Sequence, residues 1–95
     1  LDTSLGMPAY GIKVQLFSEN RLLAEKKTDE KGRCNLTDDC PKGKLRLEFL
    51  VEEYFIAKKA EVFFPKVTIE FLIKDGHYHV PLLLNPFGFS TYRGC

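Results

Sequence analysis

Residues 44–49 read Lys-Leu-Arg-Leu-Glu-Phe, so polar and apolar side chains alternate at every position. A period of two is typical of a β-strand that turns one face to a core and the other to water. The same alternation recurs in residues 11–18 and 67–74, and residues 22–28 form a weaker strand candidate. Because each strand has polar side chains on its second face, the pattern favours antiparallel sheets over buried parallel ones.

Turn signals divide the chain into about seven short strands, an arrangement typical of a β-sandwich. Asp75-Gly76 predicts a two-residue hairpin, because both central positions of a type I′ turn need a positive φ. Residues 85–88 read Asn-Pro-Phe-Gly, which fits a type I turn. This turn joins residues 77–84 to residues 89–94, and the last three strands are therefore predicted to form a meander.

Residues 51–60 break the alternation and predict one short helix. Glu52 and Glu53 come early in this segment and Lys58 and Lys59 late, an order that complements the helix macrodipole. A chain of 95 residues is long enough to bury one core. Residues 1–95 are therefore expected to form a single, mostly β domain with one short helix.

Charge and cysteine content limit the classes of partner and compartment. The net charge is +1, with 14 basic and 13 acidic residues spread along the chain, so no patch for nucleic acid or a membrane surface is expected. No apolar run is long enough to cross a bilayer. The three cysteines, Cys34, Cys40 and Cys95, form no Cys-x-x-Cys pair, which favours free thiols in a reducing compartment, although Cys34 and Cys40 could still pair.

Three features carry side chains suited to chemistry. Strand parity places His77 and His79 on one face, opposite the predicted core face of their strand. Periodicity alone favours incidental histidines, and a metal site lacks a third ligand. Arg33 follows a glycine turn, where it is either a solvated loop residue or a guanidinium that holds an anion. Ser90 and Tyr92 share one face of the last strand, which either completes a sheet or lines a site.

None of these features is specific alone, but their order resembles the transthyretin and 5-hydroxyisourate hydrolase superfamily. The resemblance begins with residues 1–9 (Leu-Asp-Thr-Ser-Leu-Gly-Met-Pro-Ala), and includes residues 28–33, residues 63–65 (Phe-Phe-Pro) and residues 79–84 (His-Val-Pro-Leu-Leu-Leu). It ends with Ser-Thr-Tyr-Arg-Gly at 90–94 and covers essentially the whole chain. In this resemblance the Tyr-Arg-Gly ending marks the hydrolase branch, because transthyretins, which carry thyroid hormone, lack it and the histidine at position 79.

The resemblance implies a transthyretin-like β-sandwich of two four-stranded antiparallel sheets with one short helix. It also implies a homotetramer, a dimer of dimers, with sites in a central channel at the dimer–dimer interface. The implied reaction is hydrolysis of 5-hydroxyisourate to 2-oxo-4-hydroxy-4-carboxy-5-ureidoimidazoline in urate degradation, a part of purine catabolism. No cofactor and no metal are expected, and the implied compartment is the cytoplasm or the peroxisome.

Matching motifs implies roles for individual residues. His79 resembles the family's catalytic histidine, which positions or deprotonates water. Arg33 resembles the arginine that binds the substrate's delocalised negative charge and stabilises charge on a carbonyl oxygen. Tyr92 resembles the tyrosine that contacts the substrate, and Ser90 and Cys95 are also expected in the substrate-binding site.

The chain departs from the family pattern at both ends. The family carries another catalytic histidine in a His-Val-Leu-Asp motif, and this sequence begins at the leucine of that motif, Leu1. Either this histidine and part of the first strand precede Leu1 in the native protein, or the molecule is impaired as a hydrolase. We expect the first alternative, because the rest of the motif is intact. Cys95 stands where the family usually has serine, and the effect is expected to be modest because a thiol only weakens the hydrogen bond.

Two other classes of function stay open. A transthyretin-like carrier would bind a small hydrophobic ligand in the tetramer channel, whereas His79, Arg33 and the Tyr-Arg-Gly ending predict a smaller and more polar site. A plain interaction module would be monomeric, and it would tolerate substitution of Tyr92 and His79 with no loss except of stability.

Overall fold

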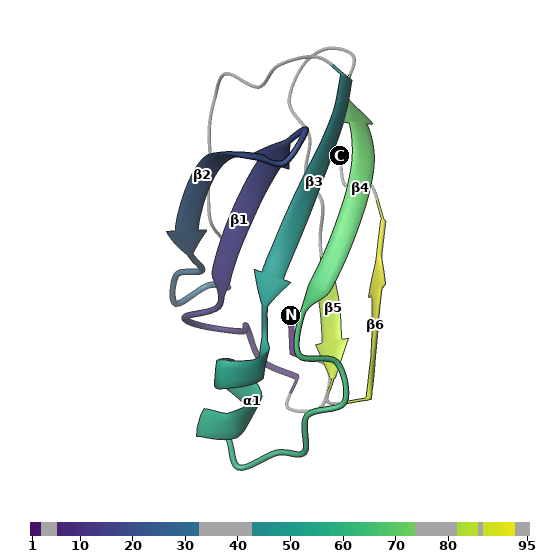
Figure 1. Ribbon diagram of the computed structural model, residues 1–95. Coiled ribbons are helices and arrows are strands. Elements are labelled where there is room, and N and C mark those ends of the chain that lie inside the picture. The colour runs from purple at the N-terminus through teal and green to yellow at the C-terminus, as the bar shows by residue number, and fades with distance from the viewer. Residues whose placement is uncertain (3–5, 33–42, 74–81, 86, 93–95) are drawn as a thin grey trace.

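The computed structural model describes residues 1–2, 6–32, 43–73, 82–85 and 87–92. This part of the chain contains six strands and one helix, and the helix follows the third strand (Figure 1). The elements are β1 (Lys13–Ser18), β2 (Arg21–Lys27), β3 (Gly43–Leu50), α1 (Glu52–Ala57), β4 (Val67–Ile73), β5 (Leu82–Asn85) and β6 (Gly88–Thr91). The four strands predicted before residue 75 are confirmed to within two residues at their ends.

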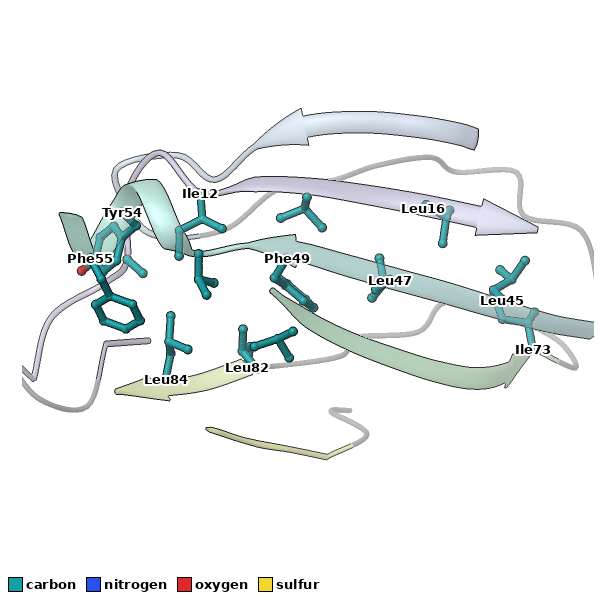
Figure 2. Packing of buried hydrophobic residues seen from close by; sticks show 14 residues of the cluster. Ile12, Leu16, Leu45, Leu47, Phe49, Tyr54, Phe55, Ile73, Leu82 and Leu84 are labelled. Carbon is teal, nitrogen blue, oxygen red and sulfur yellow. The ribbon is translucent and has the colours of Figure 1, made fainter. Parts of the chain in front are cut away.

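Two antiparallel sheets pack face to face around one core. The first sheet has the strand order β2-β1-β3-β4, and the second pairs β5 with β6. Figure 2 shows side chains from both sheets pointing into the layer between them. The described residues therefore confirm the β-sandwich with one short helix. The second sheet has two described strands, and Asp2 extends it through a parallel bridge to Leu84.

The predicted alternation accounts for the core. In β4, Val67 and Ile73 are buried, whereas Thr68, Glu70 and Leu72 are exposed. Burying one aliphatic or Phe side chain stabilises a fold by about 1.5–3 kcal/mol, so this apolar layer is the main force between the sheets. Its buried members from the β1 and β3 regions and from β5 are Ile12, Val14, Leu16, Leu45, Leu47, Phe49, Leu82 and Leu84.

Helix α1 lies at the end of β3 and packs two aromatic side chains into the core (Figures 1 and 2). The rings of Tyr54 and Phe55 meet edge to face, with centroids 5.3 Å apart. The helix ends earlier than predicted, because Lys59 takes a left-handed φ of 57° and the Ala60 N–H donates to the Phe55 carbonyl at 2.9 Å, as in a Schellman ending. Within the described ranges, no helix has the length and hydropathy needed to span a membrane.

The predicted meander of the last three strands is wrong. Strand β4 pairs with β3 in the first sheet, whereas β5 pairs with β6 in the second. The predicted hairpin at Asp75-Gly76 lies outside the described residues. The prediction failed because a turn signal acts over a few residues and does not specify the sheet that the next strand joins. Both strands cover the same core, but from opposite sides, so their apolar patterns look alike.

Candidate functional site

The second sheet has an outer face that points away from the core. Leu82 and Leu84 of β5 are buried and point toward the first sheet (Figure 2). Leu83 lies between them and therefore points the other way. Its direct partner across the sheet is Ser90 of β6, and direct partners in an antiparallel pair share a face. Ser90 is exposed and Leu83 is half-buried, so a hydroxyl and an apolar side chain lie together on this outer face.

Tyr92 follows β6 directly, and 58% of its surface is exposed. Alternate side chains of an extended chain share one side, so the sequence pattern predicts that Tyr92, the residue after β6, lies on the side of Ser90. The outer face combines the hydroxyl group of Ser90, which can both donate and accept hydrogen bonds, with the apolar side chain of Leu83. The hydroxyl of Tyr92 is predicted to join them.

A tight turn fixes the register of β5 on β6. Asn85 pairs with Gly88 across the end of the hairpin, and the Asn85 Oδ1 accepts a hydrogen bond from the Phe87 N–H at 2.9 Å. Asparagine favours turns because its side chain binds the backbone two residues later. The predicted turn is confirmed in its described residues. Because a slip by one residue would turn every side chain to the other face, this turn determines that Ser90 faces outward.

The turn before Arg33 is held against the start of the chain. The Thr28 Oγ1 donates to the Ala9 carbonyl at 2.7 Å and accepts from the Ile12 N–H at 2.9 Å. The Asp29 carboxylate accepts from the Lys31 N–H at 2.8 Å, and the Asp29 carbonyl accepts from the Gly32 N–H at 2.8 Å. These bonds give residues 28–32 one defined path.

Glycine at position 32 meets two requirements that other residue types would not meet there. Its φ is 73°, and a Cβ at this position would lie 3.1 Å from both the Ala9 nitrogen and the Pro8 Cβ. Glycine adopts a left-handed backbone without a steric penalty, and its lack of a Cβ permits the close contact with Pro8 and Ala9. The predicted glycine turn is confirmed, and it fixes where the chain leaves toward Arg33.

Part of the predicted site lies outside the described residues. This applies to Arg33, His79 and Cys95, and also to His77, Cys34 and Cys40. Ser90 and Tyr92 are described: Ser90 lies on the outer face of the second sheet, and Tyr92 is an exposed residue directly after β6. Among the residues that the structure describes, no group of three or more His, Cys, Asp or Glu side chains could hold a metal ion.

The sequence pattern gave no sign of a buried contact between Asp2 and Tyr54. Asp2 is 1% exposed, and its Oδ2 accepts a hydrogen bond of 2.6 Å from the Tyr54 hydroxyl. Burial and the hydrogen bond to Asp2 raise the pKa of Tyr54 above its ordinary value of 10, so the phenol keeps its proton and donates. No local pattern links two residues that are 52 positions apart.

Comparison with known proteins shows to which family this chain belongs. A profile of the HIUase/Transthyretin family matches residues 1–94. The chain belongs to the HIUase/Transthyretin family. Among its relatives is a protein of Caulobacter vibrioides named 5-hydroxyisourate hydrolase. The two are 40% identical over an alignment that covers 99% of this chain and 92% of the Caulobacter protein. The resemblance drawn from the sequence motifs is thereby confirmed.

Two solved structures show the range of this family. A 5-hydroxyisourate hydrolase of Klebsiella pneumoniae superposes with a TM-score of 0.94 at 36% identity, covering 100% of this chain and 92% of that one. Sea bream transthyretin in complex with thyroxine superposes with a TM-score of 0.90 at 27% identity, covering 99% of this chain and 89% of that one. One fold therefore supports proteins of different function, and the side chains of the site must distinguish them.

Proposed function

We propose that this member of the family hydrolyses 5-hydroxyisourate to 2-oxo-4-hydroxy-4-carboxy-5-ureidoimidazoline in urate degradation. The observation that carries the proposal is the 40% identity, over nearly the whole chain, to a protein named as this hydrolase. The outer face of the second sheet supports it, because Ser90 and Tyr92 give that face hydroxyl groups where a carrier of a hydrophobic ligand would favour apolar ones.

In the proposed reaction, water adds to a ring amide carbonyl, the carbon–nitrogen bond breaks, and the ring nitrogen takes a proton. His79 positions or deprotonates the water, since imidazole titrates near neutral pH. Arg33 binds the delocalised negative charge of the substrate and stabilises the carbonyl oxygen as it becomes negative. Tyr92, Ser90 and Cys95 contact the substrate, and no cofactor takes part.

The parallel bridge at the start of the chain supports a role for residues upstream of Leu1. Leu1 and Asp2 run beside β5 in the same direction: the Leu84 N–H donates to the Leu1 carbonyl at 2.8 Å, and the Leu1 nitrogen donates to the Leu82 carbonyl at 2.9 Å. A segment before Leu1 that kept this direction would continue along the second sheet. In the proposed site, the histidine that the family carries two residues before this leucine acts together with His79.

The proposed assembly is a homotetramer, a dimer of dimers, with the sites in its central channel. Large apolar side chains are exposed on β6 and next to it, which is typical of a protein–protein interface. The members of this group include Phe63, Phe87, Phe89 and Tyr92, and the ring of Phe64 contacts the ring of Phe89 edge to face at 5.6 Å. The odd number of cysteines supports a reducing compartment such as the cytoplasm or the peroxisome.

The test is to generate 5-hydroxyisourate from urate with uricase and to follow its decay with and without this protein. We expect accelerated decay that falls by about 10²–10⁴-fold in His79→Ala, the range for loss of a general base. His77→Ala is the matched control and should keep the activity. A version extended upstream by His-Val should be the more active one. If neither version accelerates the decay, the proposal is wrong.

A second candidate function is transport of a hydrophobic ligand, because the thyroxine-bound transthyretin of sea bream shares the fold. Thyroxine binding, measured by calorimetry on the same sample, separates the two functions. Tight thyroxine binding without hydrolysis would establish the carrier. A monomer in gel filtration that neither binds thyroxine nor turns over 5-hydroxyisourate would indicate an interaction module.

A further inference from the structure

A buried carboxylate joins the start of the chain to helix α1. Asp2 is the buried polar or charged residue of the described part of the chain, and its carboxylate accepts the hydroxyl proton of Tyr54 at 2.6 Å. Tyr54 is itself buried, beside Phe55 in the apolar cluster that Figure 2 shows. A buried carboxylate destabilises a fold unless it is hydrogen-bonded, whereas an apolar side chain at position 2 would add to the core. Asp2 meets this requirement through Tyr54, and the contact therefore ties the start of the chain to helix α1.

The backbone around Asp2 touches the second sheet and the turn that follows. Asp2 bridges Leu84 in parallel and Met7 in antiparallel orientation, and its N–H donates to the Met7 carbonyl at 2.9 Å. The side chain of Leu84 faces the core. The side chain of its neighbour Leu83 points to the other face of β5, where Ser90 is its partner across the sheet. The path from Tyr54 to the outer face therefore runs through Asp2 and the backbone of β5.

We propose that the hydrogen bond between Tyr54 and Asp2 is a positioning contact for the site on the outer face of β5 and β6. It holds residues 1–2 in a single register on β5, and through that register it sets the place of Leu83 and of its partner Ser90. This inference rests on the proposed hydrolase function. Two residues of backbone pairing are a short contact, and a slip by one residue would turn every side chain to the other face.

The effect on catalysis follows from geometry. A misplacement of about 1 Å costs roughly 10²-fold in rate, because reacting groups must be held at a fixed distance and angle. Tyr54 and Asp2 lie on the core side of the sheet and do not reach the outer face, so they act through the backbone of β5. Their loss is expected to lower kcat more than it raises KM.

The experiment compares Tyr54→Phe and Asp2→Ala with two controls in the full chain extended upstream by His-Val. Asp2→Asn keeps an oxygen that accepts the Tyr54 proton, so it should retain most of the activity. Val14→Ala removes a buried side chain of β1 that is not part of the contact, and it reports the effect of lost stability alone. The readouts are kcat and KM for 5-hydroxyisourate, and the exchange rate of the Leu84 amide proton, which donates to Leu1.

We expect Tyr54→Phe and Asp2→Ala to lower kcat by about tenfold, the equivalent of 1.4 kcal/mol in the barrier, and to speed exchange at Leu84 by about tenfold relative to the amides of β3. Asp2→Asn and Val14→Ala should change neither kcat nor the exchange rate at Leu84 relative to the amides of β3. Equal losses of kcat in Val14→Ala and Tyr54→Phe, or unchanged exchange at Leu84, would overturn the positioning role. An inactive parent protein would instead overturn the proposed function, and the exchange at Leu84 would then decide alone whether the bond holds the register.

Discussion

Leu83 and Ser90 lie directly opposite each other across β5 and β6, on the face that points away from the buried Leu82 and Leu84. On the outer face of the second sheet Ser90 is exposed, while Leu82 and Leu84 of the same hairpin close the core. Substitutions on this face should therefore change ligand binding without changing stability. Substitutions of Leu82 or Leu84, which face the core, should instead lower stability. The first two predictions use this separation.

Ser90→Trp should block the outer face. The large indole would fill the space beside Leu83, and because Ser90 is exposed, the free energy of unfolding should change by less than about 0.5 kcal/mol. We expect kcat/KM for 5-hydroxyisourate to fall by about tenfold or more, equivalent to at least 1.4 kcal/mol of transition-state binding. Thr68→Trp is the matched control, because Thr68 is an exposed strand residue of the other sheet. An equal loss of activity in the control would contradict the assignment.

Tyr92→Phe removes only a hydroxyl group, so it tests whether that hydroxyl contacts the substrate. Loss of a hydrogen bond from an uncharged group costs about 0.5–1.5 kcal/mol, and we expect KM to rise accordingly with an unchanged melting temperature. Tyr10→Phe is the control, since Tyr10 is 64% exposed and Tyr92 58%. Steady-state kinetics at several substrate concentrations measure the effect. Identical KM values in the two variants would remove Tyr92 from the proposed site.

Gly32→Ala should destabilise the protein more than Gly11→Ala. Both glycines have a left-handed φ, 73° and 83°, but only at Gly32 does an added Cβ approach other atoms, at 3.1 Å from Pro8 and Ala9. The shared backbone penalty is about 1 kcal/mol, and the clash at Gly32 should add about 1–3 kcal/mol. Urea denaturation measures the difference. Because Gly32 leads to Arg33, this variant should also lose activity, and Gly11→Ala should keep it.

The charged network of Glu48 predicts a pH dependence of stability. Glu48 accepts a hydrogen bond from Lys66 at 3.1 Å and from Arg46 at 2.9 Å, and the Lys66 contact in particular lowers the pKa of Glu48 below its ordinary value of 4.5. A carboxyl whose pKa is lower in the folded state stabilises the fold above its unfolded pKa and loses that contribution as the pH falls through the folded value.

Glu48→Gln should therefore be less stable than the parent protein at pH 7, by less than about 1 kcal/mol for a pair near the surface. The difference should shrink as the pH falls below 4.5. Thermal unfolding at a series of pH values measures it. Glu70→Gln is the control, because Glu70 and Lys44 form an ion pair of 3.3 Å between largely exposed side chains. A constant difference across the pH range would show that the charge of Glu48 contributes nothing to stability.

Local pattern determined most of the elements of this protein. The alternation of polar and apolar residues at 44–49, and the same pattern elsewhere in the chain, determined the strands and their buried faces. The polarity of each strand side chain decides whether it faces the core or water. The Asn-Pro-Phe-Gly turn determined the register of β5 and β6, since its geometry depends on four neighbouring residues. The order of motifs determined the family, which the profile match over residues 1–94 confirms.

Only the tertiary structure decided how these elements combine. It placed β4 and β5 in different sheets, against the meander that the turns predicted, because two strands that cover one core from opposite sides carry the same apolar pattern. It also brought Asp2 to Tyr54, which is 52 positions away. Contacts over such separations depend on the packing of the whole core rather than on neighbouring residues, so periodicity and turn chemistry do not reveal them.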